Sequence, residues 1–119
     1  MKIAITATGN NLTSDMDSRF GRAKGFIIYD DSNGDFIYKD NEQNLNAVQG
    51  AGIQAAKTII DSGCFSLITG NVGPKAFAAL NSASIKIYTG ASGSVLESIE
   101  AFKKGELTLT FDATVEGHH

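Results

Sequence analysis

The first forty residues alternate between short apolar runs and polar turns. Apolar runs rich in isoleucine and aromatic residues cover 2–8, 25–30 and 35–40, and each run predicts a β-strand. The last two runs are separated by residues 31–34, which end in Asn-Gly. Because this pair accepts the positive φ angles of a tight turn, the pattern predicts an antiparallel hairpin preceded by one further strand.

Helical spacing replaces the strand pattern after the hairpin. Small and apolar residues over 48–62 recur at helical intervals and predict an amphipathic helix that Gly63 ends. The elements predicted next are a strand at 64–69, a helix at 74–82, a strand at 84–88 and a helix at 94–104 that opens with a capping box. Residues 107–111 are a candidate edge strand outside this order.

The order β-β-β-α-β-α-β-α predicts an α/β fold of the ribonuclease-H-like, three-layer type. Its mixed five-stranded sheet would carry helices on its faces, with right-handed crossovers between parallel strands. A flavodoxin-like doubly wound sheet is less favoured, because a hairpin joins two of the strands. No linker or low-complexity tract divides the chain, so we expect one domain over residues 1–111 and a tail over 112–119.

Composition narrows the classes of function. A net charge of −3 argues against a nucleic-acid partner. One cysteine, Cys64, excludes an internal disulfide and a multi-cysteine metal site within the chain. There is no signal segment, and no apolar run approaches the roughly 20 residues that span a membrane. We therefore expect a cytoplasmic protein without a membrane partner, either a monomer or a weak dimer.

A Thr-Gly dipeptide closes three of the predicted strands, at residues 8–9, 69–70 and 89–90. If these three strands are mutually parallel, their carboxyl ends share the edge at which open α/β sheets bind ligands. Helices that begin at this edge present free N–H groups and attract anions. The pattern predicts a small-anion site, although Thr-Gly also makes tight strand-to-helix turns with no ligand.

The two arginines of the chain, Arg19 and Arg22, lie three residues apart in one glycine-containing loop. Arginine is a planar fork of donors that suits anions with several oxygen or sulfur atoms. Lys75 follows the predicted start of a helix and adds charge to the same edge. The alternative is that both arginines only pair with Asp15 and Asp17 in solvent.

Several kinds of catalysis are excluded by residues that the chain lacks at the required positions. The predicted central strands carry no carboxylates for a two-metal nuclease, and no phosphate-loop motif is present. The only histidines are His118 and His119 at the end of the chain, so neither a serine nor Cys64 has a plausible base. The two histidines are either ligands of a soft metal or part of a tail.

Three motifs in order carry a resemblance to a known family. They are residues 17–23 (Asp-Ser-Arg-Phe-Gly-Arg-Ala) followed by Phe26, residues 50–53 (Gly-Ala-Gly-Ile), and residues 69–76 (Thr-Gly-Asn-Val-Gly-Pro-Lys-Ala). With this spacing the chain resembles, over nearly its whole length, the dinitrogenase iron–molybdenum cofactor biosynthesis family of NifX-, NafY- and NifB-C-terminal-like proteins.

The resemblance implies a ribonuclease-H-like fold without nuclease activity. It implies a non-catalytic carrier of an anionic metal–sulfur cluster, of Fe–S, Mo–Fe–S or Mo–Cu–S type, held non-covalently, with cofactor-assembly proteins as partners. The motifs contain no histidine or cysteine ligand, which favours carriage or storage over nitrogenase assembly proper. A histidine near the C-terminus of some relatives makes His118 a secondary candidate ligand.

The predicted cluster-binding residues are Asn10, Arg19, Phe20, Gly21, Arg22, Gly50, Gly52, Gly70, Asn71, Gly73, Lys75 and Gly90. The main alternative is a binder or enzyme of a small phosphorylated metabolite at the same edge, against which the missing general base weighs. A protein-interaction domain with a vestigial site is a further alternative.

Overall fold

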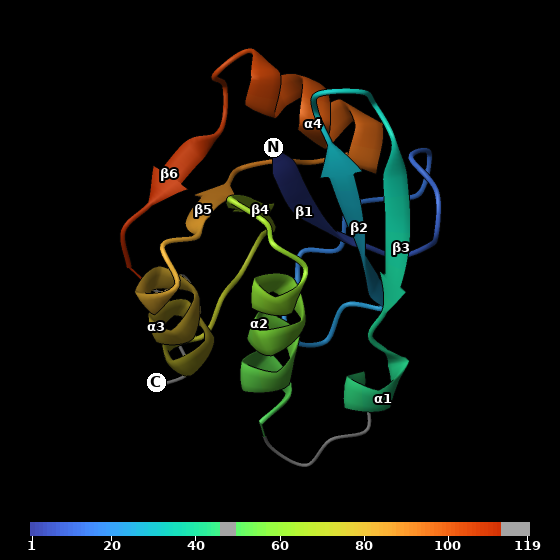
Figure 1. The fold of residues 1–119 in the computed structure, drawn as a ribbon. Helices are drawn as coiled ribbons and strands as arrows, with labels where there is room; N and C mark the ends of the chain where they lie inside the picture. The colour runs from blue at the N-terminus through green and yellow to red at the C-terminus, as the bar shows by residue number, and fades with distance from the viewer. Residues whose placement is uncertain (46–49, 113–119) are drawn as a thin grey trace.

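The computed structural model describes residues 1–45 and 50–112, and Figure 1 shows their arrangement. The strands are β1 (Lys2–Ala7), β2 (Gly25–Asp30), β3 (Phe36–Asp40), β4 (Ser66–Ile68), β5 (Lys86–Thr89) and β6 (Thr108–Thr110). The helices are α1 (Glu42–Leu45), α2 (Ala51–Asp61), α3 (Pro74–Ser82) and α4 (Val95–Lys103). The short helix α1 was not predicted. Residues 48–49 of the helix predicted over 48–62 lie outside the described residues.

The sheet has six strands in the order β3-β2-β1-β4-β5-β6. Strands β1, β4 and β5 are mutually parallel, whereas β2, β3 and β6 run antiparallel to their neighbours. The prediction of five strands is wrong, because the segment treated only as a candidate forms β6 on the open edge of β5. A mixed α/β fold is confirmed, and its assignment to the ribonuclease-H-like type stays a prediction.

Helices cover both faces of the sheet, which gives three layers. Ala55, Ala56 and Ile59 of α2 are buried in a cluster with Ala4 of β1 and Leu67 of β4. On the opposite face, Val95 and Ile99 of α4 are buried with Ile3, Ile5 and Ile68. In Figure 1, α2 and α3 accordingly lie together while α4 lies apart from them. Successive residues of β1 point to opposite faces, so this one strand contributes to both clusters.

The carboxyl ends of the three parallel strands share one edge, as the sequence predicted. The registers Ile3↔Ser66 and Ser66↔Lys86 align β1, β4 and β5 in the same direction. Helices α3 and α4 begin just after β4 and β5, and α2 runs back toward the start of β4. All three of these helices therefore have their N-termini at the carboxyl edge of the sheet. Within the described residues, no helix has the length and apolar character needed to cross a membrane.

Cys64 lies two residues before β4, at the amino ends of the parallel strands, and is buried. Burial raises the pKa of its thiol to about 11, because the thiolate form loses its hydration, while Lys2 opposes this effect. The fold therefore favours the neutral thiol.

We expect this preference to make stability depend on pH. A thiol pKa near 11 in the folded protein, above the ordinary 9.0, means that the stabilisation is complete below pH 9 and is lost as the pH rises toward 11. Urea denaturation of the parent and of Cys64→Ala at several pH values measures it. The parent should lose more stability over this range than the variant, and parallel curves would contradict the assignment.

Candidate functional site

Residues 17–23, which carry Arg19 and Arg22 and which we call the arginine loop, are attached to the carboxyl edge of the sheet through their backbone. The N–H of Asp17 donates to the carbonyl of Thr6, at the end of β1, with a distance of 2.8 Å. Farther along, Asn71 donates to the carbonyl of Ser18 at 2.7 Å and accepts from the N–H of Phe20 at 3.1 Å. The loop thus bridges β1 and the connection from β4 to α3, so backbone pairing determines where Arg19 lies.

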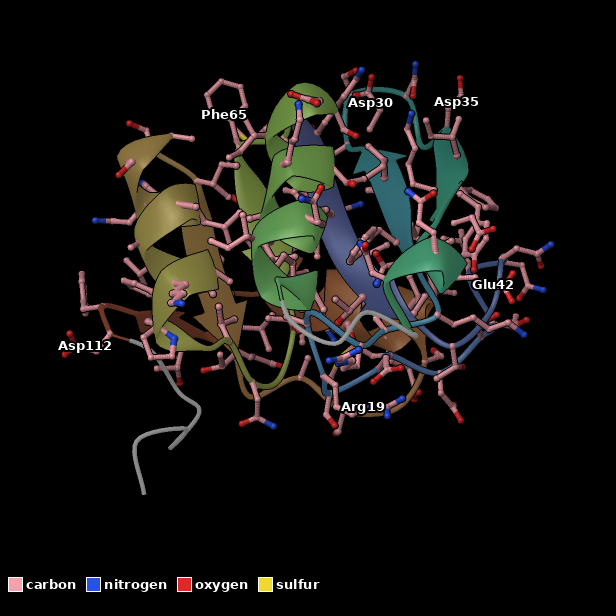
Figure 2. All side chains as sticks on the ribbon, turned by 90° about the horizontal axis from the view of Figure 1, so that it is seen from below. Arg19, Asp30, Asp35, Glu42, Phe65 and Asp112 are labelled. Carbon is pink, nitrogen blue, oxygen red and sulfur yellow. The ribbon has the colours of Figure 1, made fainter. Side chains whose placement is uncertain are left out.

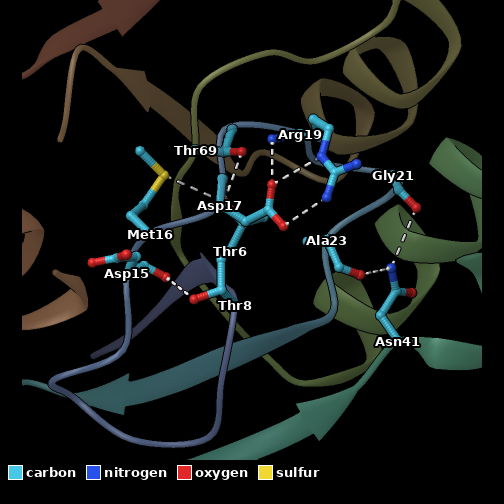
Figure 3. A network of polar contacts seen from close by, with 10 residues as sticks. All are labelled: Thr6, Thr8, Asp15, Met16, Asp17, Arg19, Gly21, Ala23, Asn41 and Thr69. Atoms are coloured by element: carbon cyan, nitrogen blue, oxygen red, sulfur yellow. Dashed lines mark hydrogen bonds and ion pairs between the residues drawn. The ribbon is translucent and has the colours of Figure 1, made fainter. Parts of the chain in front are cut away.

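Two buried threonine hydroxyls lie beneath the loop. The Oγ1 of Thr6 donates to the carbonyl of Asp17 and lies 2.9 Å from the Oγ1 of Thr69, as Figure 3 shows. Both side chains are fully buried. These hydroxyls therefore support the loop from inside the protein and do not face a ligand.

Arg19 is exposed but held in place by a carboxylate. Its Nε donates to Oδ1 of Asp17 at 3.2 Å and its Nη2 to Oδ2 at 3.3 Å, while its backbone N–H donates to Oδ1 at 3.0 Å. The hydrogen bond and charge of Asp17 raise the pKa of Arg19 above its ordinary value. The pairing with Asp17 considered from the sequence is present, and it orders the guanidinium (Figure 3).

Arg22 is held from the opposite side of the loop, by the segment around α1. Its Nη1 donates to the carbonyl of Asn44 at 3.0 Å. The side chain of Asn41 donates to the carbonyls of Gly21 and Ala23 at 3.3 and 2.8 Å. The two asparagines are buried and joined by a 2.6 Å hydrogen bond. The sequence analysis missed both, although asparagines just after a strand are a recognisable turn signal.

Glycines allow the loop, α2 and α3 to approach one another closely. A Cβ on Gly21 would lie 3.0 Å from the Cα of Gly52, and a Cβ on Gly52 would lie 3.2 Å from the Cβ of Ala76. Gly50 and Gly73, in contrast, have nothing within 4 Å of the Cβ position. Gly50 also has a φ of 80°, a backbone conformation that favours glycine. Of these four glycines, Gly50 and Gly73 therefore face open space.

The N-termini of α2 and α3 have no side-chain caps. Their N-cap residues are Gly50 and Gly73, and neither helix has an acidic residue in its first turn. Helix α4 differs, because Ser94 and Glu97 form a complete capping box with distances of 3.1 and 2.8 Å. The first-turn N–H groups of α2 and α3 therefore lack the carboxylate or hydroxyl that satisfies those of α4. Each of these two ends attracts negative charge.

Two adjoining depressions, which we call the glycine cradle, lie where these elements meet. The first, of about 360 Å³, is lined by Arg19, Phe20, Gly21, Arg22, Gly50, Ala51, Gly52, Asn71 and Gly73. The second, of about 400 Å³, is lined by Phe20, Gly21, Gly50, Gly52, Ile53, Gly73, Pro74, Lys75 and Ala76. A third depression of about 480 Å³, which shares both arginines with the first, is lined by Thr8, Asp17, Arg19, Arg22 and Lys24. Figure 2 shows Arg19 at the lower end of the molecule in that view.

Most of the residues predicted from the sequence lie in the cradle, and three described ones do not. Asn10 is in an exposed loop, and the Cβ position of Gly90 lies nearest to Thr108, in β6. Gly70 lies beneath the arginine loop, 2.7 Å from the carbonyl oxygen of Ser18 at its Cβ position. Part of the cradle was missed, since Ile53, Pro74 and Ala76 line it as well. His118 lies outside the described residues.

The donor set of the cradle fits an anion and does not offer direct ligands to a metal ion. Of the residues that the structure describes there, the charged ones are Arg19, Arg22 and Lys75, and the other polar groups are backbone and the amide of Asn71. In the described part of the chain, no group of three or more histidine, cysteine, aspartate or glutamate residues could hold a metal.

The fold and this site define an α/β protein with a cationic, glycine-lined depression at the carboxyl edge of its sheet. Residues 1–105 match the dinitrogenase iron-molybdenum cofactor family, and the chain belongs to that family. The resemblance inferred from the three motifs is confirmed.

Individual relatives are similar to this chain over nearly their full lengths. The apo form of the orange protein from Desulfovibrio gigas has a TM-score of 0.93 and 37% identity, with 96% of each chain covered. A Thermotoga protein solved by NMR as a candidate NifB protein has a TM-score of 0.83 and 36% identity, with 98% of each chain covered. Protein MJ0580 of Methanocaldococcus jannaschii is 32% identical, with 90% of this chain and 89% of the relative covered.

The two classes of glycine should respond differently to the same substitution. In Gly70→Ala, the new Cβ would lie 2.7 Å and 2.8 Å from backbone atoms of Ser18, so the arginine loop must shift. We expect a loss of about 1–3 kcal/mol in the free energy of unfolding. Gly73→Ala meets nothing within 4 Å and has a φ of −72°, so its effect should stay within about 1 kcal/mol. Urea denaturation measures both, and equal losses would show that the close approach at Ser18 does not support the loop.

Proposed function

We propose that this protein is a non-catalytic carrier that binds an anionic metal–sulfur cluster in the glycine cradle, for cofactor assembly, storage or transfer. The observation that carries the proposal is the convergence of two uncapped helix N-termini with two ordered arginines. Membership of the dinitrogenase iron-molybdenum cofactor family supports a cofactor-binding or carrier role. The identity of the metals, whether Fe–S, Mo–Fe–S or Mo–Cu–S, follows from the resemblance and is part of the proposal.

The chemistry of the cradle suits a sulfide-rich anion. Sulfide ligands at the surface of a cluster accept hydrogen bonds from N–H groups, which the first turns of α2 and α3 and the guanidinium groups supply. Arg22 donates to the carbonyl of Asn44 at 3.0 Å, and Arg19 donates to the carboxylate of Asp17, so both side chains are held beside the cradle. Ile53 and Pro74 provide apolar contact beside these donors. Such a site holds its cargo without a covalent bond to the protein, so cargo can be passed on.

Catalysis finds no support among the cradle residues. A general base must lie within hydrogen-bond reach of the proton that it removes. Among the described residues that line it there is no histidine or carboxylate, and nearby Asp17 is occupied by Arg19. A small phosphorylated ligand would use the same N–H groups, so this second candidate is decided by experiment.

Replacing both arginines should abolish cluster retention. Charge-assisted hydrogen bonds are each worth about 1.5–3 kcal/mol, so we expect Arg19→Ala with Arg22→Ala to weaken retention by at least about a hundredfold. The proteins are purified without oxygen, incubated with tetrathiomolybdate, iron or copper, and analysed by visible spectroscopy and elemental analysis. Far-ultraviolet circular dichroism checks that each variant is folded.

The matched control removes the same amount of positive charge from the opposite edge of the sheet. Lys86 begins β5 and Lys104 follows α4, and both are exposed. The variant Lys86→Ala with Lys104→Ala should retain the cluster as the parent does. If the arginine variant also retains it, the site is wrong; if the parent stays colourless but binds phosphate, the phosphorylated-ligand alternative replaces the cluster.

An aspartate introduced at the N-cap of α3 should block the cradle and at the same time stabilise the helix. Gly73 is the N-cap of α3 with φ −72° and ψ 165°, a conformation in which Asp can accept first-turn N–H groups. We expect Gly73→Asp to stabilise the protein by a few tenths to about 1 kcal/mol and to abolish cluster binding. Thermal unfolding and the visible spectrum measure the two effects.

Ser94→Asp provides the control, because it adds the same charge to the N-cap of α4, which already has a capping side chain. This variant should bind the cluster normally. Normal binding by Gly73→Asp would show that the N-terminus of α3 is not part of the site.

A further inference from the structure

Asp17 is the only buried acidic side chain among the described residues, with 6% of its surface exposed. Its backbone is fixed on both sides by Thr6, which accepts from the N–H of Asp17 at 2.8 Å and donates its hydroxyl to the Asp17 carbonyl. A buried carboxylate is tolerated only with compensating partners. Arg19 is that partner, since it donates three hydrogen bonds to the carboxylate.

The contact with Asp17 engages one edge of the guanidinium, and among the described residues no partner is recorded for its remaining N–H groups. Asp17 accepts from Nε and Nη2 of Arg19, whereas a guanidinium carries five N–H donors in a planar fork. Arg19 lines both the depression that contains Asp17 and the cradle. Arg19 thus contacts the carboxylate of Asp17 and also lines the cradle together with Gly50, Gly52 and Asn71.

We propose that Asp17 is a positioning residue, which holds the Arg19 guanidinium in the orientation that presents its remaining N–H groups to an anion in the cradle. This inference rests on the proposed function, because it assigns Asp17 a part in the same site. A long side chain that is already ordered loses less freedom when the ligand binds. Asp17 is within the motif but lies outside the set of residues predicted to bind the cluster.

Charge and positioning predict opposite effects of Asp17→Asn. The substitution removes a negative charge beside the cradle, and this alone would strengthen the binding of an anion. Asparagine has the same shape and keeps an acceptor for the backbone N–H of Arg19, but it holds the guanidinium less firmly. A loss of affinity despite the more positive site therefore reports the lost orientation of Arg19.

The experiment compares four proteins: the parent, Asp17→Asn, Arg19→Ala, and the variant with both changes. Each is loaded without oxygen with tetrathiomolybdate and copper, and the loss of the charge-transfer absorbance is followed after dilution. We expect Asp17→Asn to release the cluster about tenfold faster than the parent. The double variant should release it no faster than Arg19→Ala, because Asp17 acts through Arg19.

An independent measurement reports the orientation of Arg19 without any cluster. The chain has two arginines, so a proton–nitrogen NMR spectrum contains at most two Nε–H signals. We expect the Arg19 signal to exchange slowly with water in the parent and quickly in Asp17→Asn. A purely structural role for Asp17 would leave the exchange rate unchanged relative to that of the Arg22 signal.

Several outcomes would overturn the inference. One is cluster retention in Asp17→Asn equal to or longer than in the parent, and another is an equal effect of Asp17→Asn in the presence and absence of the Arg19 side chain. If the parent takes up no cluster, the proposed function fails by itself. Sodium sulfate then serves as the probe, with binding followed on the backbone amide signal of Gly52: weaker binding by Asp17→Asn supports the positioning role, and equal or tighter binding overturns it.

Discussion

The close approach of three backbone segments at the carboxyl edge of the sheet is the constraint on which the rest of the structure depends. A Cβ on Gly21 would lie only 3.0 Å from the backbone of Gly52 in α2, and a Cβ on Gly70 would lie 2.7 Å from the carbonyl oxygen of Ser18, which is closer than the backbone allows. These contacts bring the arginine loop against two helix N-termini. The backbone hydrogen bonds between Ser18, Phe20 and Asn71 then hold it there, so the chemical character of the site follows from packing that only glycine permits.

The three helices that begin at this edge differ in whether a side chain caps the N-terminus. Helix α4 satisfies its own N-terminus with Ser94 and Glu97, and it packs against the opposite face of the sheet. Helices α2 and α3 begin with glycine and leave their first turns open to the cradle. Capping residues there would stabilise the fold, so their absence is consistent with a site in which stability is given up for ligand binding.

The charge of the side chains around the arginine loop is opposite in sign to the net charge of the chain. The chain has a net charge of −3, yet the described residues that line the cradle include three cationic side chains and no carboxylate. Arg19 is neutralised by the buried Asp17, whereas Arg22 donates to a carbonyl of the segment around α1. The two arginines therefore differ in their recorded partners, a buried carboxylate for Arg19 and a backbone carbonyl for Arg22, and both line the cradle.

The sequence by itself determined the order of most elements, the shared edge of the parallel strands and the concentration of cationic and glycine residues there, because alternation, helical spacing and turn residues act locally. It left β6 as a candidate and missed α1. Both elements have partners distant in the chain, since β6 pairs with β5 and α1 accepts a hydrogen bond from Arg22. Only the tertiary structure decided that Gly50 and Gly73 face open space whereas Gly70 packs on Ser18. It also decided that Asn10 and Gly90 lie outside the cradle and that Asp17 is buried beneath Arg19. These properties depend on which segments fold against each other, and local sequence patterns do not contain that information.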